Sequence, residues 1–148
     1  DITLENNIIS IQIALEALSY IILVEKEGLL DDEQFDQNNA SKNIKLVLNA
    51  CNIPHGSDEL ELFDDWIRGK FDDGVDIVIY FRNKIVHPVR KDNRANLTVE
   101  DMWNIIQIGT KYIELIVLSF IGYKGEYSNR LKERWFGEVE VVPWNKLD

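Results

Sequence analysis

The stretch VDIVIYFRNKIVHP, residues 75–88, joins an apolar run to a short polar cluster, and the rest of the chain is organised around it. Because the apolar run continues through Arg82 and Asn83, we predict a helix. A strand over residues 75–81 is the alternative, which the β-branched and aromatic residues there favour. A proline disfavours helical geometry in the residue before it. The sequence therefore predicts an apolar helix that ends near His87.

The polar end of this stretch groups three side chains that suit phosphate chemistry. On a helix, Asn83 and His87 are four residues apart and share one face, and Arg82 lies about 140° from His87 around the axis. An imidazole titrates near neutral pH, and a guanidinium donates two parallel hydrogen bonds to phosphate oxygens. Arg82, Asn83 and His87 are therefore the candidate catalytic residues.

The distribution of charge singles out the same segment. The net charge of the chain is −10, which is unfavourable for a nucleic-acid binder. Residues 82–94, however, hold five basic side chains against Asp92 alone, a balance of +4. A solvated turn would have this composition too, but a phosphate-attracting patch beside His87 is the functional interpretation. The candidate RNA-binding residues are Lys84, Arg90, Lys91 and Arg94.

Apolar residues recur at helical spacing in further segments that short polar connections join. We predict helices over residues 3–27, 40–52, 57–70 and 98–121, and a loop or short helix over residues 29–39. The tail from residue 123 is irregular, with a possible short strand over residues 138–142. The predicted fold is all-α: residues 1–148 form a single domain, a bundle of four to five helices with an irregular C-terminal tail.

Composition narrows the class of protein further. A single cysteine, Cys51, excludes an internal disulfide and fits a reducing compartment, so we expect a cytoplasmic protein. The sequence contains neither a glycine-rich phosphate loop nor a Cys/His ligand set, so we expect no cofactor and no metal site. Polar side chains interrupt the apolar run over residues 8–24, which predicts a bundle helix rather than a membrane span. The chain starts at Asp1 and its only methionine is Met102, so we expect a piece of a longer protein.

Four further reactive side chains receive structural interpretations. His55 lies in a Pro-His-Gly turn without a partner motif, so we predict an exposed loop residue that can serve as a control position. Asp64 and Asp65 have no histidine or further acid at matching spacing, which favours a solvated helix face over paired catalytic carboxylates. Cys51 falls in an apolar helical pattern, which predicts a buried structural thiol.

The pattern Arg82-Asn83-x-x-x-His87 at the end of an apolar helix, within a small acidic helical chain, resembles the defining motif of the HEPN superfamily. The run GYKGEYSNRLKERWFGEVEVVPW, residues 122–144, is similar to the HEPN domain of ApeA-type anti-phage proteins. The resemblance implies a metal-independent endoribonuclease that acts in anti-phage defence, through abortive infection, or as a toxin. It also implies an N-terminal sensor domain in the full-length protein.

The resemblance assigns a role to each candidate residue. RNA would be cleaved by attack of its own 2′-hydroxyl, with His87 transferring protons, Arg82 neutralising charge on the phosphate and Asn83 orienting the phosphate or His87. HEPN ribonucleases commonly dimerise with two motifs facing each other, so we expect a homodimer with a composite active site. The alternative is a non-catalytic HEPN module for dimerisation or partner binding, in which Arg82 and His87 form a structural hydrogen-bonding pair.

Overall fold

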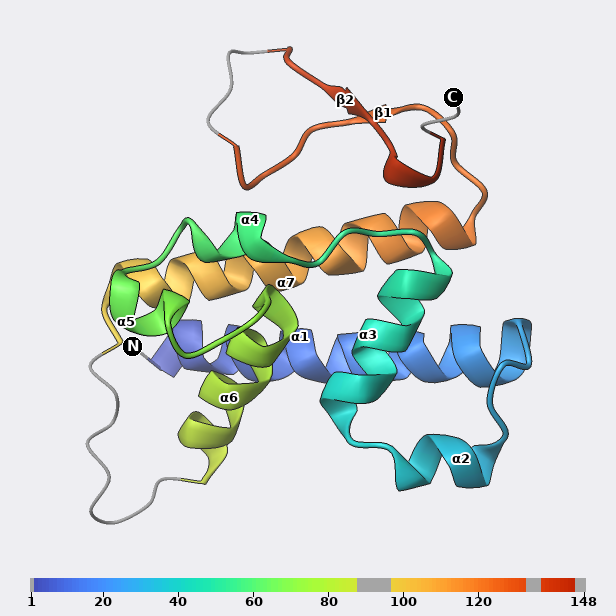
Figure 1. The fold of residues 1–148 in the computed structure, drawn as a ribbon, viewed down its shortest axis with the longest axis horizontal. Helices are drawn as coiled ribbons and strands as arrows, with labels where there is room; N and C mark the ends of the chain where they lie inside the picture. Colours follow the sequence, from blue (N-terminus) through green and yellow to red (C-terminus); the bar gives the residue numbers. More distant parts are fainter. Residues whose placement is uncertain (1, 88–96, 133–136, 146–148) are drawn as a thin grey trace.

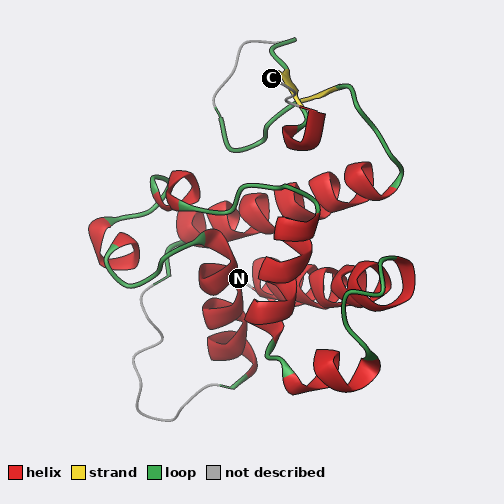
Figure 2. Ribbon diagram, turned by 45° about the vertical axis from the view of Figure 1, so that its right-hand side comes forward, coloured by secondary structure: helices red, strands yellow, loops and turns green. Residues whose placement is uncertain are grey.

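Helices account for nearly all of the regular structure (Figures 1 and 2). The computed structural model describes residues 2–87, 97–132 and 137–145. The elements are α1 (Ile2–Tyr20), which continues as a π-helical segment (Ile21–Lys26), α2 (Asp32–Gln37), α3 (Ala40–Ala50), α4 (Ser57–Leu60), α5 (Asp65–Arg68), α6 (Gly74–Val86), α7 (Val99–Phe120), β1 (Glu126–Tyr127), β2 (Glu140–Val141) and a short 3₁₀ helix (Pro143–Asn145). The predicted all-α class with an irregular tail is confirmed.

The two longest helices, α1 and α7, run side by side, and α3 and α6 cross them (Figure 1). A Cβ atom at Gly109 on α7 would overlap Ile11 Cγ2 on α1, so glycine permits the close approach of the two helices. All four helices contribute to one core. Its fully buried members include Ile8, Ile44, Ile77, Phe81 and Ile105.

Helix α6 has clear start and stop signals. The side chain of Asp73 accepts a hydrogen bond from the Asp76 N–H at 3.0 Å, which caps the first turn. At the other end, His87 leaves helical geometry (φ −121°, ψ 71°) while its N–H still donates to Asn83 O at 2.8 Å. The predicted helix is therefore confirmed, and the alternative strand over residues 75–81 is wrong.

The predicted helix over residues 57–70 is wrong, because the structure breaks it into α4 and α5. Asp64 is extended (φ −66°, ψ 160°) where a continuous helix would need helical angles. Aspartate favours helix starts because its side chain competes for backbone N–H groups. The break still leaves Phe63 and Ile67 buried in the core.

Helix α1 with its π-helical continuation, Ile2–Lys26, is long and apolar enough to cross a membrane by length and composition. In this fold it packs against α3, α6 and α7 as a core helix, and Ile8, Leu15 and Leu23 are buried there. The bundle-helix prediction for this segment agrees with that packing.

The C-terminal tail is tied to α7 by polar contacts. Strands β1 and β2 pair antiparallel, with Glu126 opposite Val141. Arg130 Nε donates to Glu114 Oε2 on α7 at 3.0 Å, and Trp144 Nε1 donates to Tyr123 O at 2.6 Å. Only part of the predicted strand over residues 138–142 forms, since β2 is two residues long.

Candidate functional site at the C-terminal end of helix α6

The last two turns of α6 are anchored by an aromatic side chain from the core. Phe81 is fully buried. Its ring lies 6.2 Å from that of Trp66 on α5 and 6.0 Å from that of Phe71, measured between centroids. Because Phe81 faces inward, the residues that follow it are carried to the edge of the buried face and to the solvent. This packing fixes where Arg82 and Asn83 lie.

Arg82 is half-buried, and its hydrogen-bonding capacity is largely unused. Its Nη1 donates to Asn83 Oδ1 at 3.2 Å, while its Nε is enclosed and has no hydrogen-bond partner among the described residues. Arg68 and Arg130, the other arginines that the structure describes, pair with Asp65 and Glu114. No described acid lies within ion-pair distance of Arg82, so the described residues leave its positive charge without a carboxylate partner.

Asn83 and His87 are both exposed, as their place on the solvent side of α6 requires. Among the described residues, no hydrogen bond joins the imidazole of His87 to the Arg82 guanidinium or to any other group. The structural Arg82–His87 pair of the non-catalytic alternative is therefore not present. The structure brings Arg82 and Asn83 together and leaves His87 one helical turn beyond Asn83.

Of the four candidate RNA-binding residues, the structure places one. Lys84 is half-buried on α6, and its Nζ lies 5.5 Å from the centre of the Tyr80 ring. Arg90, Lys91 and Arg94 lie outside the described residues.

The opposite end of α6 holds a polar cluster that the sequence analysis missed. Asp73 is only 6% exposed. Lys45 Nζ on α3 lies 3.3 Å from Asp73 Oδ2 and 2.7 Å from Asp76 Oδ2. Burial lowers the pKa of the Lys45 ammonium, but the carboxylates of Asp76 and Asp73 outweigh burial, and the pKa is raised overall. An Asp three residues before another Asp at the start of an apolar run is an N-cap signal that could have pointed to this end.

His55 lies in the loop between α3 and α4, as predicted, but the prediction that it is exposed is wrong. Its side chain is 15% exposed. Its Nδ1 lies 3.2 Å from Asp73 Oδ2, and its Nε2 lies 2.9 Å from Asn49 Oδ1. The partners come from the N-cap of α6 and from α3, which local sequence around a Pro-His-Gly turn cannot reveal.

A buried tyrosine packs against the first turn of α6. Tyr112 is fully buried, and its hydroxyl has no hydrogen-bond partner among the described residues. Burial, and then the carboxylate of Glu59, raise the pKa of Tyr112 well above its usual value. A Cβ atom at Gly74 would lie 2.6 Å from this hydroxyl, so the first residue of α6 must be glycine for the helix to approach α7. The hydroxyl is closed to solvent and therefore is not a surface site.

The remaining reactive side chains behave as structural groups. Asp64 and Asp65 are exposed, as predicted. Cys51 is buried, and burial raises the pKa of its thiol. Within the part of the chain that the structure describes, no three His, Cys, Asp or Glu side chains are arranged to hold a metal ion.

A cavity of about 580 Å³ lies between α7 and the C-terminal tail, away from the candidate site. The lysines in its lining are already paired: Lys111 with Glu59 at 3.7 Å, and Lys132 with Glu140 at 2.9 Å. Arg82, Asn83 and His87 do not line it.

Comparison with known proteins places this chain in a family. The model of the YopA C-terminal domain matches residues 1–141. The SPbeta prophage-derived protein YopA of Bacillus subtilis (strain 168) is 34% identical over 146 residues, which cover 97% of this chain and 32% of the relative. The chain thus spans about a third of that relative's length. No solved structure matches this chain. The chain belongs to the YopA C-terminal domain family.

Proposed function

We propose that this domain is a metal-independent endoribonuclease of the HEPN type, with Arg82, Asn83 and His87 as its catalytic residues. The observation that carries the proposal is the Arg82 guanidinium, which lies at the exposed end of α6 without a carboxylate partner among the described residues. An arginine that the fold does not neutralise is suited to bind an anion. An exposed imidazole follows it one turn later.

The reaction uses a nucleophile that RNA supplies itself. His87 removes the proton of the ribose 2′-hydroxyl, and the 2′-oxygen forms a bond to the adjacent phosphorus. The bond to the 5′-oxygen of the next nucleotide breaks, and that oxygen takes up a proton. The terminal nitrogens of Arg82 neutralise the charge that develops on the phosphate, and Asn83 holds the guanidinium through its Oδ1. The products carry a 2′,3′-cyclic phosphate and a 5′-hydroxyl.

One imidazole cannot easily act as both base and acid in a single turnover, so the proposal includes a homodimer with a composite site. Large apolar side chains are exposed on α1, α6 and α7, and α1 and α7 both begin on the side of the molecule where α6 ends (Figure 1). They include Ile2, Val86, Val99 and Trp103, while Ile13, Val117 and Phe120 are exposed elsewhere on α1 and α7. Burying them against a second copy would bring two Arg82/His87 sets together.

The biological setting is part of the proposal. We place the activity in the cytoplasm, in phage defence or as a toxin, since the relative is encoded by a prophage. The chain spans about a third of that relative. A sensor domain that controls the nuclease would lie in the remaining two-thirds.

The test is cleavage of an unstructured RNA by the purified chain in the presence of EDTA. The expected products end in a 2′,3′-cyclic phosphate, and the same oligonucleotide with a single 2′-deoxy residue at the cleaved position is expected to be inert there. Cleavage of the deoxy position would refute 2′-hydroxyl attack. A clean dimer with no cleavage would favour the partner-binding alternative, and a monomer at micromolar concentration in sedimentation would count against the composite site.

A further inference from the structure

An aromatic surface lies beside the candidate site. It consists of Trp66 on α5, Phe71 in the turn before α6 and Tyr80 on α6, packed over the buried ring of Phe81. The rings of Phe71 and Tyr80 are 5.0 Å apart between centroids and meet edge to face. Trp66 is 43% exposed although it contacts the core through Phe81. The exposed part of the indole offers an aromatic face to a ligand in solvent.

Two lysines are positioned on this surface. Lys70 Nζ donates to Tyr80 Oη at 2.7 Å and lies 4.1 Å from the centre of the Tyr80 ring. Lys84 Nζ approaches the same ring at 5.5 Å. Among the described residues, no acid lies within ion-pair distance of Lys70. The Lys70 ammonium is thus held by a cation–π contact and a phenol rather than by a carboxylate of the described residues.

The aromatic surface continues along α6 to His87. On a helix, Lys84 is 40° and His87 about 20° from Tyr80 around the axis, so all three share one face. Tyr80 and His87 are seven residues apart, which is about 10 Å along the axis. A short single strand can therefore contact both the aromatic surface and the imidazole.

These features fit one kind of occupant. Every base has a π-face that can stack on an aromatic ring, and every phosphate attracts an ammonium group. Aromatic rings beside lysines therefore suit a nucleic acid whose bases are unpaired. A duplex hides its base faces and brings more negative charge toward a chain whose net charge is −10. Resting on the proposed ribonuclease function, we propose that Trp66, Tyr80 and Lys70 bind the single-stranded RNA next to the cleaved bond, with a base on the indole and a phosphate on the lysine.

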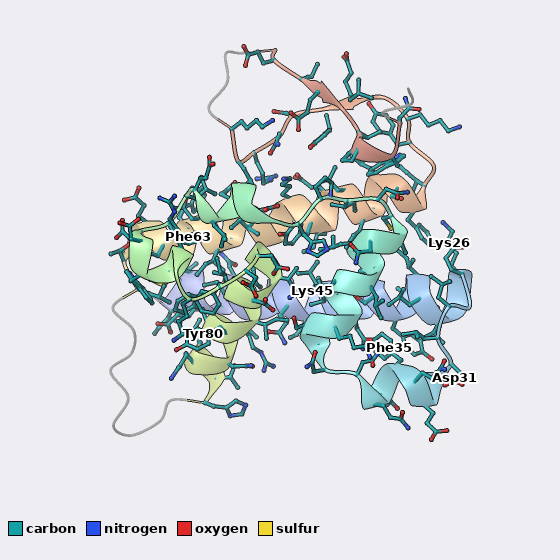
Figure 3. The ribbon with its side chains drawn as sticks, viewed as in Figure 1. Lys26, Asp31, Phe35, Lys45, Phe63 and Tyr80 are labelled. Carbon is teal, nitrogen blue, oxygen red and sulfur yellow. The ribbon has the colours of Figure 1, made fainter. Side chains whose placement is uncertain are left out.

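The molecule contains a matched control for this surface. Phe120 near the end of α7 is exposed to the same degree as Trp66, and Lys26 Nζ lies 4.7 Å from the centre of its ring. Figure 3 shows Lys26 and Tyr80 on opposite sides of the molecule. Phe120→Leu and Lys26→Gln therefore remove an exposed ring and its neighbouring lysine far from the site, although Lys26 also pairs with Glu27 at 3.7 Å.

The experiment measures binding without cleavage. Fluorescence anisotropy follows a labelled single-stranded 2′-O-methyl RNA, which has no free 2′-hydroxyl, on the full chain and on Trp66→Leu, Lys70→Gln, Phe120→Leu and Lys26→Gln. We expect Trp66→Leu to raise Kd about 5- to 150-fold. We expect Lys70→Gln to reduce the slope of log Kd against log salt by about 0.7. The two control variants should bind as the unaltered chain does.

A second oligonucleotide separates stacking from loss of fold. A strand with abasic positions keeps its phosphates but has fewer bases to stack. The unaltered chain should bind it more weakly than it binds the intact strand. Trp66→Leu should bind the two strands equally. If Trp66→Leu and Lys70→Gln both bind as tightly as the unaltered chain, or if the unaltered chain does not bind the strand, the proposal is wrong. Cleavage of ordinary RNA, measured separately, decides the ribonuclease function whatever the binding result is.

Discussion

The two ends of helix α6 differ in how they use charge. At the N-terminal end, Asp73 and Asp76 are paired with Lys45, and His55 bonds to Asp73. At the C-terminal end, Arg82 has no acid partner among the described residues. Charges that are buried and paired hold elements together, and removing one partner is costly. A charge that the fold leaves unpaired at the surface remains available to a ligand.

The two histidines of the chain illustrate the same difference. Both ring nitrogens of His55 face oxygen acceptors, on Asp73 and Asn49, so its hydrogen-bonding capacity is used by the fold. The His87 ring is exposed at the end of α6. Sequence alone suggested the opposite environment for His55. From these differences we predict that substitutions at the N-terminal end of α6 lower the stability of the fold. Substitutions at the C-terminal end of α6 should instead lower the rate of RNA cleavage.

The largest expected effects are on cleavage. His87→Ala should lower the rate about 10²- to 10⁴-fold because it removes the proton-transfer group, and Arg82→Ala about 10²- to 10³-fold because it removes charge at the phosphate. Asn83→Ala should lower it less, since Asn83 only orients its neighbour. Rates under single-turnover conditions, with circular dichroism as the check on folding, measure these effects. Full activity in His87→Ala or in Arg82→Ala would show that the residue replaced is not catalytic.

Asp73→Ala should have the largest effect on stability. The change removes the cap of α6 and a buried partner of both Lys45 and His55. We expect the free energy of unfolding to fall by about 2–4 kcal/mol in urea titrations. The neighbouring exposed Asp72→Ala is the control and should change stability little. Equal stabilities for the two variants would show that the cluster is not structural.

His55→Ala should have a smaller effect of the same kind. Loss of its two hydrogen bonds, to Asp73 and Asn49, should lower the free energy of unfolding by about 1–2 kcal/mol. Lys45 still pairs with Asp73 in this variant, so the cluster is weakened rather than removed. A denaturation midpoint equal to that of the unaltered chain would contradict this expectation.

A carboxyl group in the C-terminal tail should make stability depend on pH. Burial raises the pKa of Glu140, but hydrogen bonds from Tyr127, Lys132 and Asn129 outweigh burial and bring the pKa to about 2, below its usual 4.5. A carboxyl group whose pKa is depressed by folding stabilises the protein above its unfolded pKa, and this stability is lost as pH falls from about 5 toward 2. Glu140→Gln should reduce the fall in melting temperature that thermal melts show as pH is lowered from about 5 toward 2.

Local pattern predicted the helix that carries the site, because the apolar run and the proline that ends it both lie within residues 75–88. The contact between Arg82 and Asn83 also follows from their adjacency. The cluster at the other end could not be predicted, since His55 is 18 residues from Asp73 and Lys45 is 31 residues from Asp76 in sequence. The aromatic surface was missed for the same reason: Trp66 meets Phe81 only after the chain turns at Phe71.

The two ends of α6 are proposed to differ in role, structural at the N-terminal end and catalytic at the C-terminal end. The most direct test of this difference compares the two histidine variants in one assay. Cleavage of a single unstructured RNA is measured in EDTA for His87→Ala and His55→Ala, at a temperature where circular dichroism shows both folded. The account predicts that His87→Ala loses at least about 100-fold in rate, while His55→Ala stays within a few-fold of the unaltered chain. Wild-type cleavage by His87→Ala, or an equal loss in folded His55→Ala, would contradict it.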